Sequence, residues 1–181
     1  MPGPKQLLRF GGVTLLRHAA QTAVAARCGP VVVVLGAAAT AKQFRFELVD
    51  LDVSVVENHK WKDGMSSSIR AGIEALETGS PEAVLLMTCD QPYVTAAVLK
   101  QLVAAFHQDH PPAVACAYAG TIGVPALFDH SLFGELKGLE HDQGAKRVLE
   151  RHLSRIGSIP FEQGAVDIDT PEDVPKLSGD H

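Results

Sequence analysis

The strongest constraint on the fold is an alternation between short apolar runs and longer segments with helical periodicity. Val31 to Leu35 is a continuous apolar run, the pattern of a strand that is buried on both faces in a parallel sheet. The preceding segment, 13–27, carries apolar residues at helical spacing and ends at Gly29-Pro30, a helix stop signal. These segments predict a helix and a buried strand of an α/β fold.

The same alternation continues to the end of the chain. We expect helices near residues 39–48, 66–78, 130–136 and 143–153, and a further helix that starts after Thr95 as its N-cap. We expect strands near residues 53–57, 83–89, 113–118, 124–128, 155–160 and 164–168. This order predicts a Rossmann-like three-layer α/β/α fold with an open, mostly parallel sheet and a ligand crevice at the carboxyl ends of its strands. Because no repeat or linker divides the chain, residues 1–181 are expected to form one domain.

Charge and hydropathy exclude several classes of partner. The net charge of -5, without a run of Lys and Arg, argues against binding to a nucleic-acid backbone. No apolar run reaches the roughly 18 residues that a membrane helix needs. Three widely spaced cysteines favour reduced thiols. We therefore expect a soluble cytoplasmic protein. His107 and His110 lack metal-ligand spacing, and we expect them to be surface residues.

A carboxylate stands where one predicted strand ends. Asp90 follows the run that begins at Ala83 and precedes Gln91-Pro92, and turn chemistry explains this position as well as function does. A second acidic cluster contains Asp167 and Asp169, which alternate with apolar residues and so share one face of a strand. The Thr170-Pro171 pair that follows fits the start of a helix.

Carboxylates that lie this close repel one another unless a cation or a basic group lies between them. Mg2+ binds one or two protein carboxylates together with phosphate oxygens and water, which matches Asp90 on one strand end and Asp169 on another. The alternative is that both acids are simply solvated, and whether Asp167 also binds metal stays open.

Three loops have the composition of ligand-binding loops. The segment 58–70 contains Gly64 and three consecutive serines, and places hydroxyl and N–H groups at a helix N-terminus. Its Trp61 is expected mainly to pack in the core. The Gly-rich segment 120–125 is either an ordinary turn or a place where substrate approaches the backbone. The segment 141–146 precedes a predicted helix.

In combination, these segments resemble the cytidylyltransferase branch of the MobA-like molybdenum-cofactor nucleotidyltransferases. The resemblance rests on motifs that follow the family order along almost the whole chain: Gly3-Pro4-Lys5, Asn58 to Ser68, Cys89-Asp90-Gln91-Pro92, Gly120 to Pro125, Asp142 to Ala145, and Asp167 to Asp173. The chain departs from the family pattern at Val124, His141 and Lys146.

The resemblance implies transfer of CMP from CTP to a molybdopterin-type molybdenum cofactor, with release of pyrophosphate. It implies Lys5 and Asp90 as catalytic residues that also bind the nucleotide, and Mg2+ held by Asp90 and Asp169. It further implies three residues around the base and ribose (Asn58, Gly64 and Ser68) and three at the acceptor (Gly123, Pro125 and Asp142). A molybdoenzyme or its chaperone would receive the product.

The same reasoning leaves alternatives. The donor could be GTP, the acceptor could be a sugar or polyol phosphate, and the chain could be a catalytically silent binding domain with this fold. The family opens with a strand and a Gly-rich phosphate loop immediately before the Pro-Lys pair, whereas this sequence starts at Met1. The resemblance therefore implies that this strand and most of the loop are missing, that the strands beside it are left with unpaired groups, and that nucleotide binds weakly.

Overall fold

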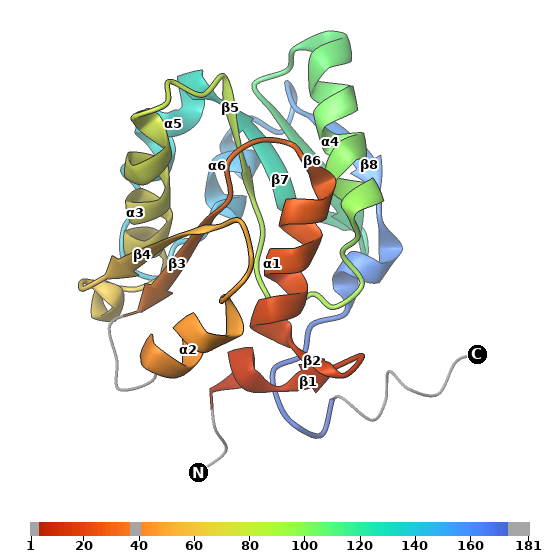
Figure 1. Ribbon diagram of the computed structural model, residues 1–181. Helices are drawn as coiled ribbons and strands as arrows, with labels where there is room; N and C mark the ends of the chain where they lie inside the picture. The colour runs from red at the N-terminus through yellow and green to blue at the C-terminus, as the bar shows by residue number, and fades with distance from the viewer. Residues whose placement is uncertain (1–3, 37–40, 174–181) are drawn as a thin grey trace.

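The computed structural model describes residues 4–36 and 41–173 and forms a three-layer α/β/α fold (Figure 1). The larger sheet has the order β5-β7-β6-β8. Its strands are β5 (Ala83–Leu86), β6 (Ala113–Tyr118), β7 (Thr121–Asp129) and β8 (Gly157–Pro160). The Rossmann-like α/β class expected from the sequence is confirmed.

Parallel and antiparallel pairs coexist in this sheet. β6 is parallel to β8, whereas β7 runs antiparallel to both β5 and β6. The reversal follows from a two-residue hairpin turn, in which Ala119 and Gly120 both have positive φ, 48° and 71°. Two positive φ angles match the twist of a tight hairpin.

A second, two-stranded sheet pairs β3 (Val32–Gly36) with β4 (Ser54–Asn58) in parallel register. In the described part of the chain, β3 and β5 are not hydrogen-bonded to each other. A short hairpin joins β1 (Arg9–Phe10) to β2 (Val13–Thr14) ahead of the first helix.

Helices cover both faces of the larger sheet, and a further helix lies beside the smaller sheet (Figure 1). They are α1 (Leu15–Ala26), α2 (Ala41–Glu47), α3 (Met65–Glu77), α4 (Ala96–Asp109), α5 (Phe133–Lys137) and α6 (Lys146–Arg151). The period-two geometry of β6 separates the two cores, because Ala113 and Ala115 pack with α3, α5 and α6, while Val114 and Cys116 pack with α4. A third cluster joins α1, α2 and β3.

Several element boundaries differ from the sequence prediction. The strand expected at 164–168 is wrong, since a 3-10 turn occupies Glu162–Ala165 and extended chain follows it. The N–H of Ile168 donates to Asp90 O at 2.8 Å, so this segment follows the exit of β5 and does not extend the sheet. The expected strand 83–89 ends at Leu86. Residues 39 and 40 of the expected helix 39–48 lie outside the described residues.

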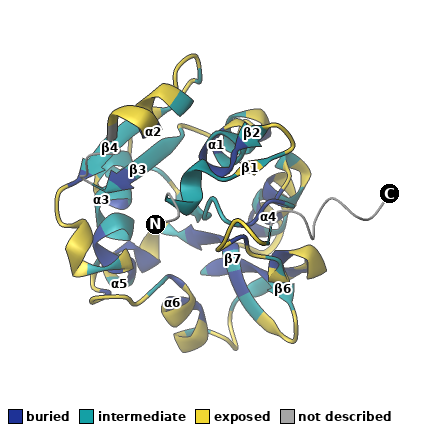
Figure 2. Cartoon of the chain, turned by 90° about the horizontal axis from the view of Figure 1, so that it is seen from below, coloured by how far each residue is buried: buried dark blue, intermediate teal, exposed yellow. Residues whose placement is uncertain are grey.

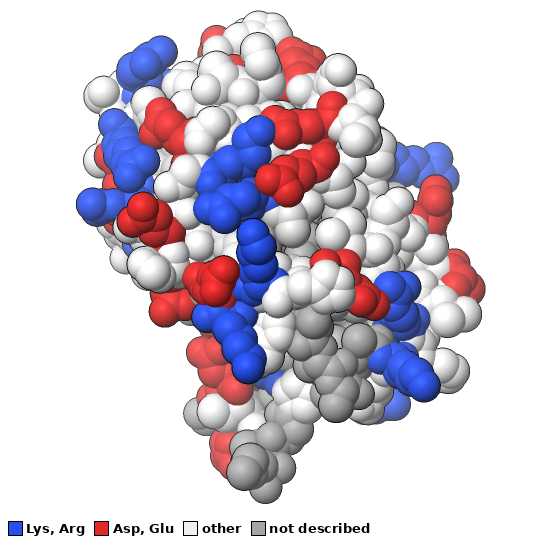
Figure 3. Space-filling model, turned by 90° about the vertical axis from the view of Figure 1, so that its left-hand side faces the viewer, with Lys and Arg blue, Asp and Glu red and all other residues white. Residues whose placement is uncertain are grey.

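Trp61 also differs from expectation. Its side chain is 45% exposed, and its Cβ lies close to Gly36 at the end of β3, so it covers a strand end and does not belong to the core. On the face formed by β4, α2 and α3, basic and acidic side chains are interspersed (Figure 3). Ion pairs there include Arg45–Glu57 at 2.8 Å and Lys137–Glu77 at 2.7 Å. None of the helices described is long and apolar enough to cross a membrane.

Candidate active site

Lys5 connects two carboxylates that are far apart in the sequence. Its Nζ donates to Asp90 Oδ2 at 2.7 Å and to Asp169 Oδ1 at 2.8 Å. The lysine starts a short 3-10 turn, Lys5–Leu7, while Asp90 follows β5 and Asp169 follows the turn at Glu162–Ala165. The structure thus brings together three residues that the sequence motifs singled out, with a basic group between the two acids.

Opposing effects set the charges in this cluster. Burial opposes the positive charge of Lys5, but its hydrogen bonds to Asp169 and Asp90 outweigh burial and raise its pKa. Burial also favours the neutral form of Asp90, yet hydrogen bonds from Lys5 and the Thr88 side chain hold its pKa below the ordinary value. For Asp167, burial and the negative charges of Asp90 and Asp169 raise the pKa. Three carboxylates therefore share one nearby ammonium group, which leaves a negative site.

A buried isoleucine orients the acidic segment. Ile168 is fully buried, and its N–H donates to the carbonyl of Asp90. Because side chains alternate along extended chain, Asp167 and Asp169 on either side of Ile168 are exposed. The Asp173 carboxylate accepts from Thr170 N at 2.9 Å and from Asp169 N at 3.3 Å, which holds the following turn.

The donor set suits a hard divalent cation. Asp90 and Asp169 both present a carboxylate oxygen to Lys5 Nζ. Mg2+ prefers oxygen ligands such as carboxylates, and the excess negative charge of this site favours a cation. Asp167 is not a close third ligand in the described structure, since these three acids do not form a group whose ligand atoms all lie within 4.8 Å of one another. Asp90 and Asp169 are the residues that could hold the metal.

Gln91 links the Asp90 segment to β7. Its Nε2 donates to Val124 O at 3.1 Å and to Gly164 O at 2.9 Å. Gly123 is buried, and a Cβ there would collide with the Tyr118 side chain, whose hydroxyl donates to Val124 O at 3.0 Å. Pro125 is fully buried. The contacts around Gly123 and Pro125 thus stabilise the fold. A contact of these two residues with an acceptor stays a prediction.

Asn58 organises the loop that follows β4. It is 5% exposed, and its Nδ2 donates to Ser67 Oγ at 2.7 Å and to Ser68 Oγ at 3.0 Å. Its Oδ1 accepts from Lys60 N at 2.9 Å. Because both N–H groups and the carbonyl of this amide are engaged, Asn58 holds the loop against the start of α3.

Gly64 brings a second loop against the first. Its φ is 94°, and a Cβ would collide with the backbone of His141 and the side chain of Asp142. The N–H of Ser66 donates to His141 O at 3.1 Å. Arg70 of α3 donates to Lys137 O and Leu139 O at 2.9 and 3.1 Å, which fixes the start of the second loop. This role of Arg70 has no signal in the sequence pattern.

The candidate residues form two groups at one end of the molecule. Asn58 ends β4 and Asp90 follows β5, so both groups lie beyond strand ends, on the side that Figure 2 views. One group is Lys5, Asp90 and Asp169, and the other is Asn58, Gly64, Ser68 and Asp142. Across residues 4–36 and 41–173, no hydrogen bond or ion pair joins the two groups directly.

A three-layer α/β fold with a lysine and carboxylates beyond its strand ends belongs to the class of domains that bind phosphorylated ligands at that edge. The family model for the MobA-like NTP transferase domain matches residues 1–156, and the chain belongs to this family.

Similar proteins agree with this assignment. Nicotine blue oxidoreductase of Paenarthrobacter nicotinovorans is 39% identical over 101 residues, which are 56% of this chain and 48% of that protein. The chain spans about half the length of the curated relatives it matches. The crystal structure of Rv0371c from Mycobacterium tuberculosis H37Rv is similar with a TM-score of 0.78 and 28% identity, covering 99% of this chain and 91% of that one. A manganese complex of Rv0371c has a TM-score of 0.74 and 29% identity, covering 96% and 91%.

Proposed function

We propose that this chain is a nucleotidyltransferase that transfers CMP from CTP to the terminal phosphate of a molybdopterin-type molybdenum cofactor. An acceptor phosphate oxygen forms a bond to the α-phosphorus of CTP, and the bond from that phosphorus to the β-phosphate oxygen breaks. Pyrophosphate leaves with the bonding electron pair. The observation that carries the proposal is the contact of Lys5 with both Asp90 and Asp169 beyond the strand ends.

Phosphoryl chemistry of this type depends mainly on positioning and on neutralising charge, so it requires no protein nucleophile. Lys5 keeps its positive charge through the working pH range because its pKa is raised, and an ammonium group stabilises charge on phosphate oxygens. Asp90 and Asp169 would hold a divalent cation, Mg2+ in this proposal, which supplies further neutralisation of the triphosphate when bound. Manganese bound to the similar protein Rv0371c supports a divalent metal.

The two loops at the start of α3 carry the proposed specificity. Asn58 keeps Ser67 and Ser68 in place, and Gly64 together with Ser68 would face the base and ribose. Gly123, Pro125 and Asp142 would contact the acceptor. The choice of CTP and molybdopterin rests on the similarity of the 58–68 loop and the later motifs to the cytidylyltransferase branch.

The test is pyrophosphate release by purified protein with Mg2+, molybdenum-loaded molybdopterin and either CTP or GTP. We expect release with CTP, and a preference for CTP when both nucleotides compete. A preference for GTP would overturn the cytidylyl assignment while keeping the reaction. Release only with a sugar or polyol phosphate acceptor would overturn the molybdopterin assignment. Nucleotide binding without release for any acceptor would favour a silent binding domain.

A further inference from the structure

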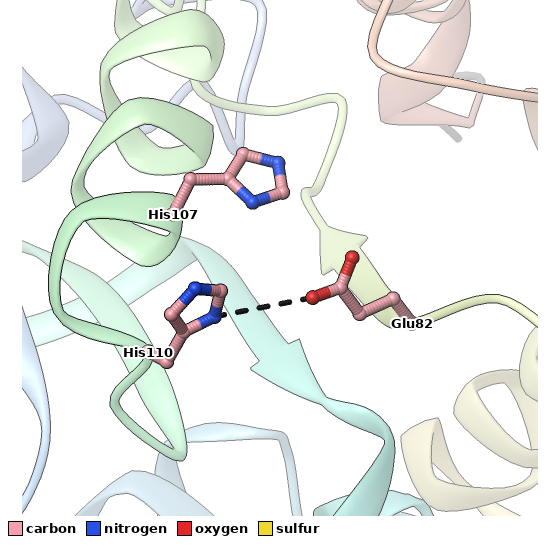
Figure 4. Close-up of side chains that lie close together, drawn as sticks. All are labelled: Glu82, His107 and His110. Atoms are coloured by element: carbon pink, nitrogen blue, oxygen red, sulfur yellow. Dashed lines mark ion pairs between the residues drawn. The ribbon is translucent and has the colours of Figure 1, made fainter.

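A second cluster of metal-ligand side chains lies away from the candidate active site. Glu82, His107 and His110 each offer one ligand atom, and these atoms all lie within 4.8 Å of one another (Figure 4). Glu82 immediately precedes β5, whereas Asp90 follows the same strand, so the two sites are at opposite ends of β5. The cluster is therefore independent of the proposed transfer reaction.

The backbone positions the three side chains from two elements. His107 lies in the last turn of α4, and His110 caps that helix in the left-handed conformation, with its N–H donating to Phe106 O at 2.8 Å. The buried Phe106 ring is edge-on to both imidazoles, with centroids 5.5 Å from His107 and 5.6 Å from His110. Both imidazoles therefore lie on the same side of α4. Figure 4 shows that this side faces Glu82.

Consecutive residues at the end of β7 hold the other side. Asp129 N donates to Pro112 O at 2.9 Å, and His130 N donates to Glu82 O at 2.9 Å. The segment after His110 and the segment that carries Glu82 are therefore fixed to the same strand end. This shared anchor sets the distance between the helix end and Glu82 before any ligand binds.

The donor chemistry favours zinc over Mg2+. Two imidazole nitrogens and one carboxylate form a ligand set that zinc uses, with a fourth position left for water, whereas Mg2+ prefers oxygen ligands alone. Ligand atoms around tetrahedral zinc are separated by about 3.3 Å at ordinary zinc–ligand distances. His110 Nδ1 and Glu82 Oε1 are 3.9 Å apart, and all the ligand atoms lie within 4.8 Å of one another, so rotations of these exposed side chains can close the remaining gaps. The His110–Glu82 ion pair involves two of the three side chains, whereas a bound ion would engage all three.

We propose that Glu82, His107 and His110 bind Zn2+ and that the ion joins the C-terminal end of α4 to the start of β5. An ion that binds the folded state alone stabilises it by mass action, so zinc raises the thermal midpoint of the protein. The sequence does not reveal this site, because the two histidines lack a familiar ligand spacing and the third donor comes from a segment well before them.

The experiment titrates metal-free protein of residues 1–181 with ZnCl2 by calorimetry and measures the thermal midpoint with and without Zn2+. The parent should bind Zn2+ and show an upward shift. His107→Ala, His110→Ala and Glu82→Gln should each weaken the binding about tenfold or more, since even loss of an outer-shell partner has that effect. They should also remove the thermal shift. All three residues are exposed, so these variants should fold.

Two controls make the result specific. His130→Ala removes an exposed histidine that lies 3.5 Å from Asp129 but is outside the cluster, and it should bind Zn2+ like the parent. Asp90→Asn removes a ligand of the other candidate metal site, and the Zn2+ binding and thermal shift that the three cluster variants lose should remain in this variant. Absence of Zn2+ binding by the parent, or equal binding by the parent and the three cluster variants, would overturn the proposal. Neither result would affect the proposed transfer reaction.

Discussion

At the scale of single residues, the candidate active site depends on how Asp90 and Asp169 share one ammonium group. Lys5 balances one negative charge, and the second carboxylate together with Asp167 leaves the site negative. Such a site can hold a cation and a triphosphate together, because the lysine and the metal both neutralise phosphate charge. The carboxylates are therefore expected to matter for binding more than for folding.

Asp90→Asn tests this expectation. The amide keeps the shape of the side chain but removes the charge that would bind the metal, so Mg2+-dependent affinity for CTP should fall about tenfold or more. The free energy of unfolding should change by about 1 kcal/mol or less, the scale of a partly exposed ion pair. Calorimetry of Mg-CTP binding and urea unfolding measure the two effects. Asp109→Asn, at an exposed site on α4, is the control, and equal Mg-CTP affinity of Asp90→Asn and the parent would refute the metal role.

The thiols provide a second residue-level test. Burial raises the pKa of Cys116 to about 12, and burial together with the charge of Asp90 raises the pKa of Cys89 to about 11. Cys28 is exposed, although burial of its thiol raises its pKa as well. Since the thiolate is the reactive form, iodoacetamide at pH 8 should modify Cys28 first in the folded protein.

Mass spectrometry of the modified peptides follows each cysteine separately. Cys116 should react only after unfolding in urea, because it is inaccessible as well as protonated. Modification of Cys116 in the native protein at the rate of Cys28 would contradict the packing of β6.

At the scale of elements, caps determine where the helices begin. Thr14 is 4% exposed, and its Oγ1 accepts from Arg17 N at 3.2 Å and donates to Glu47 Oε2 at 2.8 Å. The residue therefore caps α1 and also connects it to α2. Thr14→Ala should lower the free energy of unfolding by about 1–2 kcal/mol, the upper part of the range for N-caps.

Urea unfolding measures this loss against two matched variants. Thr14→Ser keeps the hydroxyl and should retain most of the stability, while Gln21→Ala changes an exposed position of the same helix and should be nearly neutral. An equal loss for Ala and Ser at position 14 would show that packing of the methyl group, and not the cap, is responsible.

Elements with a strong local pattern could be predicted from the sequence. The strand 113–118 was predicted with its observed bounds, and Thr95 was predicted as the cap of α4, where its Oγ1 accepts from Val98 N at 3.4 Å. The segment 164–168 could not be predicted, because its apolar alternation does not come from strand pairing. Ile168 is its fully buried large side chain, and the hydrogen bond from the N–H of Ile168 to the Asp90 carbonyl is a tertiary contact. Alternation alone does not distinguish such a segment from a strand.

At the scale of the whole molecule, the sequence motifs indicated which residues matter, but not their arrangement. The positions of Asp90 and Asp169 at predicted strand ends indicate that they lie together. Lys5 is indicated by the family resemblance alone, and the structure places it between the two acids. Neither argument placed the ammonium group between the acids, which depends on how the first turn packs against two distant loops. Likewise, only tertiary structure brings Glu82 to His107 and His110.

The separation of the β3–β4 sheet from the larger sheet also predicts uneven stability across the molecule. In the described residues, β3 and β4 pair only with each other, and Val32, Val33 and Val34 are partly exposed. In contrast, β6 lies between two strands, and Val114, Ala115 and Cys116 are fully buried. Two-stranded pairing is only marginally stable, so β3 and β4 should open locally at a lower free energy than β6 and β7.

Native-state hydrogen exchange at increasing urea measures these opening energies. Amides of β6 and β7 should exchange only through global unfolding, and those of β3 and β4 through a smaller opening with a weaker urea dependence. Val34→Ala should then speed exchange mainly in β3 and β4, whereas Val114→Ala should lower the protection of β6 and β7, because its cavity lies in the core beneath the larger sheet, which holds no residue of β3 or β4. If all strands exchange with one free energy in the parent, the two sheets unfold as a single cooperative unit and the prediction is wrong.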